Sequence, residues 1–271
     1  MCPMRILSIV TLIAVWLWFG VAVAADYYVA PTGDDGNSGT ESEPWATIQK
    51  AADVMVAGDQ VFLRGGVYHQ TVEPINSGSP GNYITYRSYP GEEAIIDVDD
   101  TSASAYGISL WDFRELRYLK FSNLTLKNAG GANVYVGADG AAKSHLVFDS
   151  LFIDNGYLGI FFRKGVTNSS ITNCQVYNCQ YNIYVDRLNE NILIDNNDVA
   201  YSHLFRPGEF WTLNLQIQGA PGSPNRNITV SNNEVHHGDI QGISVWYCED
   251  IIVRNNHCHN NGATGIDCYG Q

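Results

Sequence analysis

The chain has 271 residues, a formal net charge of -13 and a sequence pI near 4.7, with 45% hydrophobic and 16% charged residues. So acidic a composition argues against binding to nucleic acid or to an anionic membrane surface. It does not exclude an acidic polysaccharide, because Ca²⁺ could bridge like charges locally. The length is enough for one large domain or one solenoid.

Residues 1–25 have the pattern of a secretory signal peptide. Arg5 precedes an apolar run from Ile6 to Phe19, and Ala22–Ala24 supplies small residues of the A-x-A type for cleavage. The apolar run is short for a membrane anchor, and no basic residue follows it. We therefore expect a secreted protein, extracellular or periplasmic, with one domain over residues 26–271 and no membrane association after cleavage.

Residues 26–100 are expected to close the first end of that domain. The turn cluster 34–39 carries two carboxylates that could hold a cation, although we favour a self-bonded Asx loop. One amphipathic helix follows, because apolar residues recur there at helical spacing: Trp45, Ile48, Ala52 and Met55. Such a helix would shield the apolar core and strand edge at the end of a solenoid. Short strands are expected over 61–63, 83–87 and 94–96.

From residue 101 onward the chain repeats one short phrase, which is an apolar residue, a variable residue, Asn or Asp, and a second apolar residue three places on. Its intervals are 23–26 residues, with one interval of 36. The anchors are Phe121, Val147, Ile171, Ile194, Val230 and Val253. The polar positions are Asn123, Asp149, Asn173, Asn196, Asn232 and Asn255. This period indicates a solenoid, and we interpret the polar column as an interior ladder of stacked amides.

A second phrase runs in step with the first and alternates in hydrophobicity with a period of two, as in GISLW from Gly107, NIYVD from Asn182 and GISVW from Gly242. Such alternation predicts strands with one buried face. Each repeat then holds at least two short strands and has no room for a helix. Stacked coils of this kind form a parallel β-helix, an all-β fold.

The opening of the chain resembles a known family. The stretch YYVAPTGDDGNSGTESEPWATIQKAADVMVAGDQVFLRGGVYHQTV, followed by GNYITYRSYPGEEAIID, is similar to the amino-terminal segment of exported right-handed parallel β-helix proteins. Many of these are pectate-lyase-like polysaccharide lyases, and others are likened to glycosidases, epimerases and non-catalytic surface proteins. For a lyase, the resemblance implies a Lys or Arg base and a Ca²⁺ site of clustered Asp residues. The repeats contain no Asp cluster of that kind.

The outward residues of the second phrase form two columns that we interpret as a polysaccharide groove. The first column is Ser109, Tyr135, Phe161, Tyr184, Gln216, Ser244 and Asp267. The second is Trp111, Gly137, Arg163, Asp186, Gln218, Trp246 and Tyr269. Aromatic rings with flat apolar faces suit stacking on sugars, and seven rungs span roughly 30 Å. Coverage of these rings by loops, or the ordinary preference of aromatics for strands, is the alternative.

Arg163 and Asp186 fall on adjacent rungs of one column, with Lys164 and Arg187 just beyond. In a β-elimination, Arg163 or Lys164 would neutralise a uronate carboxylate, and a basic side chain would remove the acidified proton. A surface salt bridge of little consequence is the alternative. A carboxylate pair of Asp186 and Glu209 would instead suit glycoside hydrolysis.

The interval of 36 residues predicts an inserted loop beside the groove, containing Glu209 and Trp211. Four histidines lie in turns of neighbouring rungs, where they could bind a metal but hydrogen-bonded turns account for them: His236, His237, His257 and His259. Cys258 and Cys268 are expected to be buried thiols. The chain ends at Gln271 without a cap, so a longer protein is expected.

These observations favour a secreted, monomeric carbohydrate-active enzyme. Polysaccharide lyase is the first choice of chemistry, with Ca²⁺ as a possible cofactor. A glycoside hydrolase on the same fold, or a non-catalytic glycan-binding protein, stays open.

Overall fold

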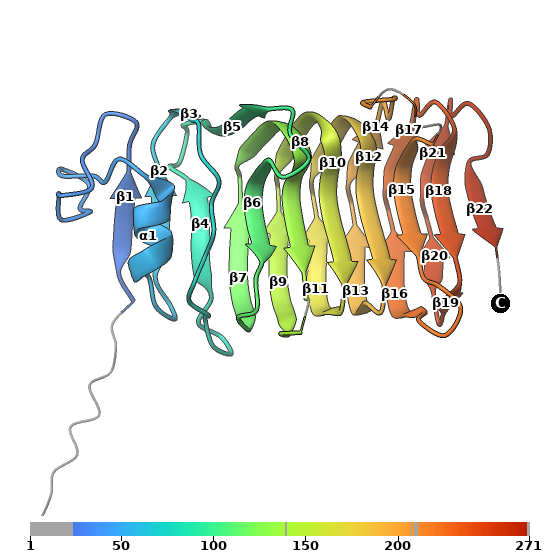
Figure 1. Ribbon diagram of the computed structural model, residues 1–271, viewed down its shortest axis with the longest axis horizontal. Coiled ribbons are helices and arrows are strands. Elements are labelled where there is room, and N and C mark those ends of the chain that lie inside the picture. Colours follow the sequence, from blue (N-terminus) through green and yellow to red (C-terminus); the bar gives the residue numbers. More distant parts are fainter. Residues whose placement is uncertain (1–23, 139, 207, 209–210, 270–271) are drawn as a thin grey trace, which may run out of the picture.

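The computed structural model describes residues 24–269 except 139, 207 and 209–210, so residues 1–23 of the expected signal peptide and Glu209 lie outside the described residues. The described part is one elongated parallel β-helix, with a short helix near its N-terminal end (Figure 1). This confirms the expected all-β class and right-handed parallel β-helix fold. No helix among these residues is long and apolar enough to cross a membrane.

The helix α1 (Ile48–Val54) lies at the first end of the solenoid, as predicted (Figure 1). The Thr47 side chain caps it by accepting a hydrogen bond from the Lys50 N–H. Its buried face consists of Ile48, Ala51 and Ala52. The turn cluster before it is the self-bonded loop, because Asp34 Oδ1 accepts a hydrogen bond from the Gly36 amide at 2.8 Å. Asp35 ties the loop to the helix start by accepting from the Ala46 and Thr47 amides and the Thr47 hydroxyl.

One sheet runs the length of the solenoid, and all its pairings are parallel. Its strands, in spatial order, are β1 (Asp26–Val29), β2 (Gln60–Leu63), β4 (Ile84–Ser88), β7 (Leu116–Ser122), β9 (Lys143–Asp149), β11 (Val166–Thr172), β13 (Glu190–Asp195) and β16 (Asn225–Ser231). The short strands β19 (Cys248–Glu249) and β20 (Ile252–Arg254) both pair with β16.

The other sheet is built around three strands of 13 residues: β8 (Thr125–Gly137), β10 (Phe152–Lys164) and β12 (Gln175–Arg187). The first residues of β12 continue into β14 (Asp198–Ala200), β17 (Glu234–His236) and β21 (His257–His259). The last residues of β12 pair with β15 (Leu213–Gln218), and the sheet extends from there through β18 (Gln241–Trp246) to β22 (Ile266–Tyr269). On the N-terminal side lie β3 (Gly66–Tyr68), β5 (Ala94–Asp100) and β6 (Tyr106–Trp111). The long strands therefore contribute to two different faces.

The core consists of stacked rows of apolar side chains inside the coils. Tyr86, Phe121 and Phe148 form one aromatic row, with ring centroids 4.8 and 5.5 Å apart. The predicted inward residues of the second phrase are buried from Ile108 to Val245. On the last described rung Ile266 and Cys268 are exposed, so the prediction of a buried Cys268 thiol was wrong.

The second anchor of the first phrase was assigned one residue too early. Phe121 pairs with Phe148, and Phe148 pairs with Ile171, whereas Val147 is only half-buried. The residue in line with Asn123 is accordingly Ser150, and both have positive φ angles, of 53° and 55°. Turn geometry therefore identifies the register better than side-chain polarity does.

The predicted interior column of amides is on the outside. Asn173, Asn196 and Asn232 are exposed and have φ angles of 55–56°, a left-handed conformation that Asn tolerates better than most residues. Their amides bond along the surface, for example from Asn196 Nδ2 to Asn173 Oδ1 at 2.8 Å. The interpretation of this column as an interior scaffold was wrong.

The interior ladder is formed by the next residue along, in Asn197, Asn233 and Asn256. Each amide oxygen accepts from the rung before it, with 2.9 Å from Asn197 Nδ2 to Asn233 Oδ1 and from Asn233 Nδ2 to Asn256 Oδ1. A second interior ladder joins Asn182 to Asn214 at 2.9 Å. These buried amides satisfy backbone groups at the corners of the coils, as buried polar groups require.

Candidate functional site

The two outward columns are in register as predicted. In the first column Phe161 pairs with Tyr184, Tyr184 with Gln216, and Gln216 with Ser244. In the second, Gln218 pairs with Trp246, and Trp246 with Tyr269. The columns therefore follow one continuous face formed by β6, β8, β10, β12, β15, β18 and β22.

Half of this face is an apolar cluster that is closed to solvent. Tyr135 and Phe161 are only 7% and 8% exposed and pack edge to face, with centroids 5.3 Å apart. Leu158 and Tyr181 belong to the same cluster. Tyr135 and Phe161 are thus covered by neighbouring side chains. Their rings are not accessible for stacking on a sugar, so the prediction that these two rings bind substrate was wrong.

The inserted loop lies against this cluster. The Arg206 guanidinium sits 3.6 Å from the Tyr157 ring centroid, and its Nη2 donates to the Gly130 carbonyl at 2.6 Å. The Gln180 side chain holds both ends of the loop, because its oxygen accepts from the Arg206 amide and its Nε2 donates to the Trp211 carbonyl. The loop therefore forms a wall beside the groove, as its position in the sequence predicted.

A pocket of about 280 Å³ opens next to this wall. Its lining residues are Tyr181, Tyr184, Trp211, Leu213, Gln216, Gln218, Gln241 and Trp246. Five of these were predicted as substrate-binding residues: Tyr184, Trp211, Gln216, Gln218 and Trp246. None of the lining side chains is ionised, so the pocket combines aromatic surface with amide groups.

Several polar atoms at the pocket are buried and have no protein partner. Gln216 Oε1, Gln241 Oε1 and Trp246 Nε1 are in this state, as is the hydroxyl of the neighbouring Ser244. Each such group costs about 1–3 kcal/mol if it stays unpaired. Their amide neighbours are by contrast bonded, with Gln216 Nε2 and the Tyr184 hydroxyl both donating to Gln218 Oε1 at 2.8 and 3.1 Å. Two acceptors and one donor of the pocket lining are therefore without a hydrogen-bond partner among the described residues.

A charged group borders the pocket along the second column. Asp186 is adjacent to Gln218, and its side chain is 13% exposed. Arg187 Nε lies 3.3 Å from Asp186 Oδ2. Burial raises the pKa of the Asp186 carboxyl, although the nearby positive charges of Arg187 and Arg163 oppose the shift. Lys164 is exposed at the end of β10 in register with Arg187, so the four predicted residues do gather here.

Because the pKa of the Asp186 carboxyl is raised, its ionised form is expected to lower the free energy of unfolding at neutral pH. The folded state holds the Asp186 proton more tightly than the unfolded chain does, so ionisation at neutral pH opposes folding. We expect Asp186→Asn to stabilise the protein at pH 7 by about 0.5–2 kcal/mol, in the range of other stabilising substitutions at functional sites. Urea unfolding should show the difference shrinking as the pH falls below the unfolded-state pKa. An unstabilised variant at pH 7 would contradict this.

The remaining predicted residues flank the pocket or lie apart from it. Asp267 accepts from Gln241 Nε2 at 2.9 Å, and the Tyr269 ring lies 5.8 Å from that of Trp246. Trp111 is 46% exposed at the far end of the face, beyond the closed cluster. Glu209 falls outside the described residues.

Sequence reasoning missed Tyr181, Leu213 and Gln241, which form a third outward column in register. The alternation breaks at Asn182 and Ile183, which both point inward, because the Asn182 amide belongs to an interior ladder. The Asn or Gly that begins each phrase was the available signal.

Comparison with known proteins gives the family. The family model described as Pel9A-like, right handed beta helix region, matches residues 27–191. The chain belongs to the Pel9A-like right-handed β-helix family. This confirms the resemblance seen in the sequence.

Individual relatives agree with this assignment. The chain is 30% identical over 172 residues to pectate lyase PEL9 of Emericella nidulans, covering 58% of this chain and 41% of that protein. It therefore spans less than half of that relative's length. The solved structure of pectate lyase Pel9A superposes with a TM-score of 0.54 at 13% identity, covering 92% and 78% of the two chains. XylC in complex with xylose superposes with a TM-score of 0.69 at 15% identity, covering 89% and 63%. These two structures share the fold.

Proposed function

We propose that this Pel9A-like protein is a secreted enzyme that binds a polysaccharide along the outer face from β12 to β22 and cleaves it by β-elimination. The observation that carries the proposal is the pocket, where unpaired buried atoms of Gln216, Gln241 and Trp246 meet the Trp211 and Tyr181 rings. Sugars offer the matching chemistry, because hydroxyl groups both donate and accept hydrogen bonds while the ring faces stack on aromatics.

The charges beside the pocket support a uronate-containing chain. The pocket itself would hold an uncharged part of the ligand, while Arg163 and Arg187 would face a carboxylate one or two sugars away. An Arg guanidinium can bind a carboxylate through two parallel hydrogen bonds. Acidic polysaccharides are thereby compatible with the net charge of -13, because Arg163, Lys164 and Arg187 place three positive charges beside the pocket.

The proposed chemistry has three parts. Arg163 neutralises the uronate carboxylate, which acidifies the proton on the adjacent carbon. Asp186 removes that proton, because a carboxylate with a raised pKa is a stronger base than an exposed one. The bond to the leaving oxygen then breaks, a C=C double bond forms, and the leaving oxygen takes a proton from water. Lys164 and Arg187 add positive charge that stabilises the intermediate carbanion.

No step of this proposal passes through Ca²⁺. Calcium prefers six to eight oxygen ligands, whereas the two predicted carboxylates of this face that the structure describes, Asp186 on β12 and Asp267 on β22, are separated by β15 and β18. A calcium ion carried by the substrate would still be compatible with the site.

Glycoside hydrolysis is the second candidate, and the raised pKa of Asp186 favours it specifically. A carboxyl that holds its proton can protonate a glycosidic oxygen, provided that a second carboxylate lies opposite. Glu209 in the inserted loop is the proposed partner.

One assay separates these possibilities. The protein is incubated with polygalacturonate, alginate and neutral glycans, with Ca²⁺ or with a chelator. We expect ultraviolet absorbance from an unsaturated product with a uronate polymer. New reducing ends without absorbance would indicate hydrolysis, and binding without either signal would indicate a glycan-binding protein.

A further inference from the structure

A second cluster of polar side chains lies on a different face of the β-helix from the pocket. It is carried by β14, β17 and β21, whereas the pocket is carried by β12, β15 and β18 (Figure 1). Glu234 pairs with His257, and His236 pairs with His259. Because alternate residues of a strand share a face, His257 and His259 both point outward beside Glu234. Cys258, between them, packs against the core.

Three of these side chains bring potential metal ligands together. One ligand atom from each of Glu234, His257 and His259 lies within 4.8 Å of the other two. The pair His259 Nε2 and Glu234 Oε1 is 3.1 Å apart. Bonds of about 2.0–2.2 Å to a tetrahedral ion place two ligand atoms roughly 3.3 Å apart. A small shift would therefore let an ion replace the shared proton.

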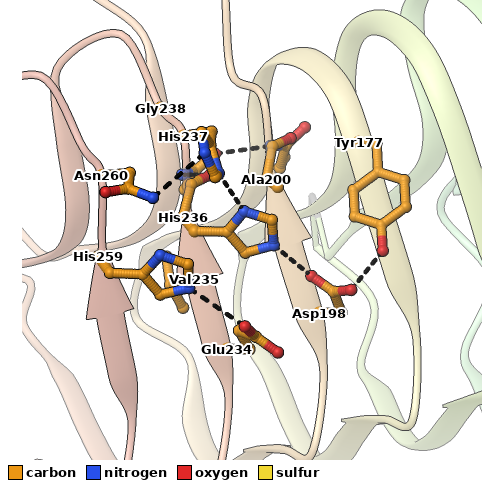
Figure 2. Close-up of polar contacts among 12 residues, drawn as sticks. Tyr177, Asp198, Ala200, Glu234, Val235, His236, His237, Gly238, His259 and Asn260 are labelled. Atoms are coloured by element: carbon orange, nitrogen blue, oxygen red, sulfur yellow. Dashed lines mark hydrogen bonds and ion pairs between the residues drawn. The ribbon is translucent and has the colours of Figure 1, made fainter.

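Neighbouring side chains pack against the His259 ring (Figure 2). The His236 ring stacks on the His259 ring, with centroids 4.9 Å apart and an interplanar angle of 4°. His236 Nε2 in turn bonds to Asp198 Oδ1 at 3.0 Å, and the Tyr177 hydroxyl donates to the other oxygen of Asp198. The His236 ring, which stacks on His259, is thus held by Asp198 on the neighbouring strand β14.

Polar contacts link Asn260, His237, His236 and Asp198 in a chain beside His259. The Asn260 amide nitrogen lies 3.3 Å from His237 Nε2, and His237 Nδ1 lies 2.6 Å from His236 Nδ1. His236 Nε2 lies 3.0 Å from Asp198 Oδ1. Figure 2 shows this chain of contacts.

We propose that Glu234, His257 and His259 bind a divalent transition-metal ion of the Zn²⁺ type. Two imidazoles and one carboxylate suit Zn²⁺, Cu²⁺ or Ni²⁺, whereas Ca²⁺ and Mg²⁺ prefer oxygen ligands. Glu234 is 52% exposed and His259 29%, so an ion can enter from solvent and water can complete its coordination. The ion would link β17 to β21 and so tie neighbouring coils together.

Titration calorimetry on the untagged protein with ZnCl₂ tests this proposal. We expect one site per chain, and we expect His257→Ala and His259→Ala each to weaken Zn²⁺ binding at least tenfold. Zn²⁺ should raise the unfolding temperature of the wild type and leave that of His257→Ala unchanged, because binding only to the folded state stabilises it. Excess Ca²⁺ should not displace Zn²⁺. Glu234→Gln, which keeps the side-chain shape, provides a second variant should a histidine variant fail to fold.

Two control variants separate this site from other binding groups. His145→Ala removes a histidine of the other sheet that stacks on Tyr118, and Cys268→Ser removes the exposed thiol. Both should bind Zn²⁺ like the wild type. The proposal is overturned if the wild type shows no saturable binding up to 1 mM Zn²⁺, if His257→Ala and Glu234→Gln bind normally, or if Cys268→Ser alone loses binding.

Discussion

Replacing Asp186 by Asn is expected to lower kcat on a uronate polymer by about 10²–10⁴-fold, the usual contribution of a positioned acid or base. Arg163→Ala should cost about 10²–10³-fold, because a preorganised charge that stabilises the developing carbanion is lost. Product formation by both variants is measured through the absorbance of the unsaturated end. Arg163→Lys should recover part of the activity, since it restores the charge but not the two-pronged geometry.

The loss of activity is informative because both variants should still bind the substrate. The pocket around Trp211 and Trp246 is intact in both, so the dissociation constant for oligosaccharide should change by less than tenfold. Arg226→Ala is a matched control, because Arg226 forms an exposed ion pair with Glu249 at 2.8 Å on the other sheet. It should be fully active. Full activity in Asp186→Asn and Arg163→Ala would remove the proposed site.

The pH dependence follows from the same carboxyl. Because burial raises the pKa of Asp186, its ionised form is lost at a higher pH than for an ordinary Asp. Elimination with Asp186 as base should therefore decline on the acid side at a pH above that ordinary value. A hydrolase using protonated Asp186 as the acid should instead lose activity as the pH rises.

The sequence was a good guide to the strands and to the columns of the outer face, because a period of two states directly which side chains share a side. It could not distinguish an exposed ring from one closed over by its neighbours. Tyr135 and Trp111 have the same kind of position in the alternation, yet one is 7% and the other 46% exposed. The difference comes from the cluster around Tyr135, in which Leu158 and Phe161 are buried and against which Tyr181 packs. Contacts between side chains of different strands are absent from any local pattern.

The backbone conformation at the corners of the coils explains why the interior ladder of amides was assigned to the wrong residues. Asn196 and Asn197 are neighbours of identical chemistry, and the repeat pattern alone does not indicate which amide points inward. The structure places the left-handed φ of 56° at Asn196, so the chain turns there and directs the Asn197 side chain into the core. Backbone conformation at one residue thus decides the environment of the next.

Asn232 and Asn233 allow this distinction to be measured as a difference in the free energy of unfolding. Asn233 is 1% exposed, and its oxygen accepts from the Asn197 amide and side chain, both at 2.9 Å. Its Nδ2 donates to the Ile194 carbonyl at 3.0 Å. Asn233→Ala leaves these buried groups without partners and should lower the free energy of unfolding by about 3–5 kcal/mol, at 1–3 kcal/mol for each group.

Substitution of the neighbouring Asn232 should have a smaller effect, although it also removes a side-chain amide. Asn232 is exposed at a φ of 55°, so Asn232→Ala should cost only about 1–2 kcal/mol, mainly from the left-handed backbone. Asn232→Gly should recover most of that loss because glycine adopts this conformation freely, whereas Asn233→Gly should recover nothing. Urea denaturation followed by circular dichroism measures all four variants. Equal losses at the two positions would mean that the ladder contributes no more than the turn, and the interior amides would then not be what holds the coils in register.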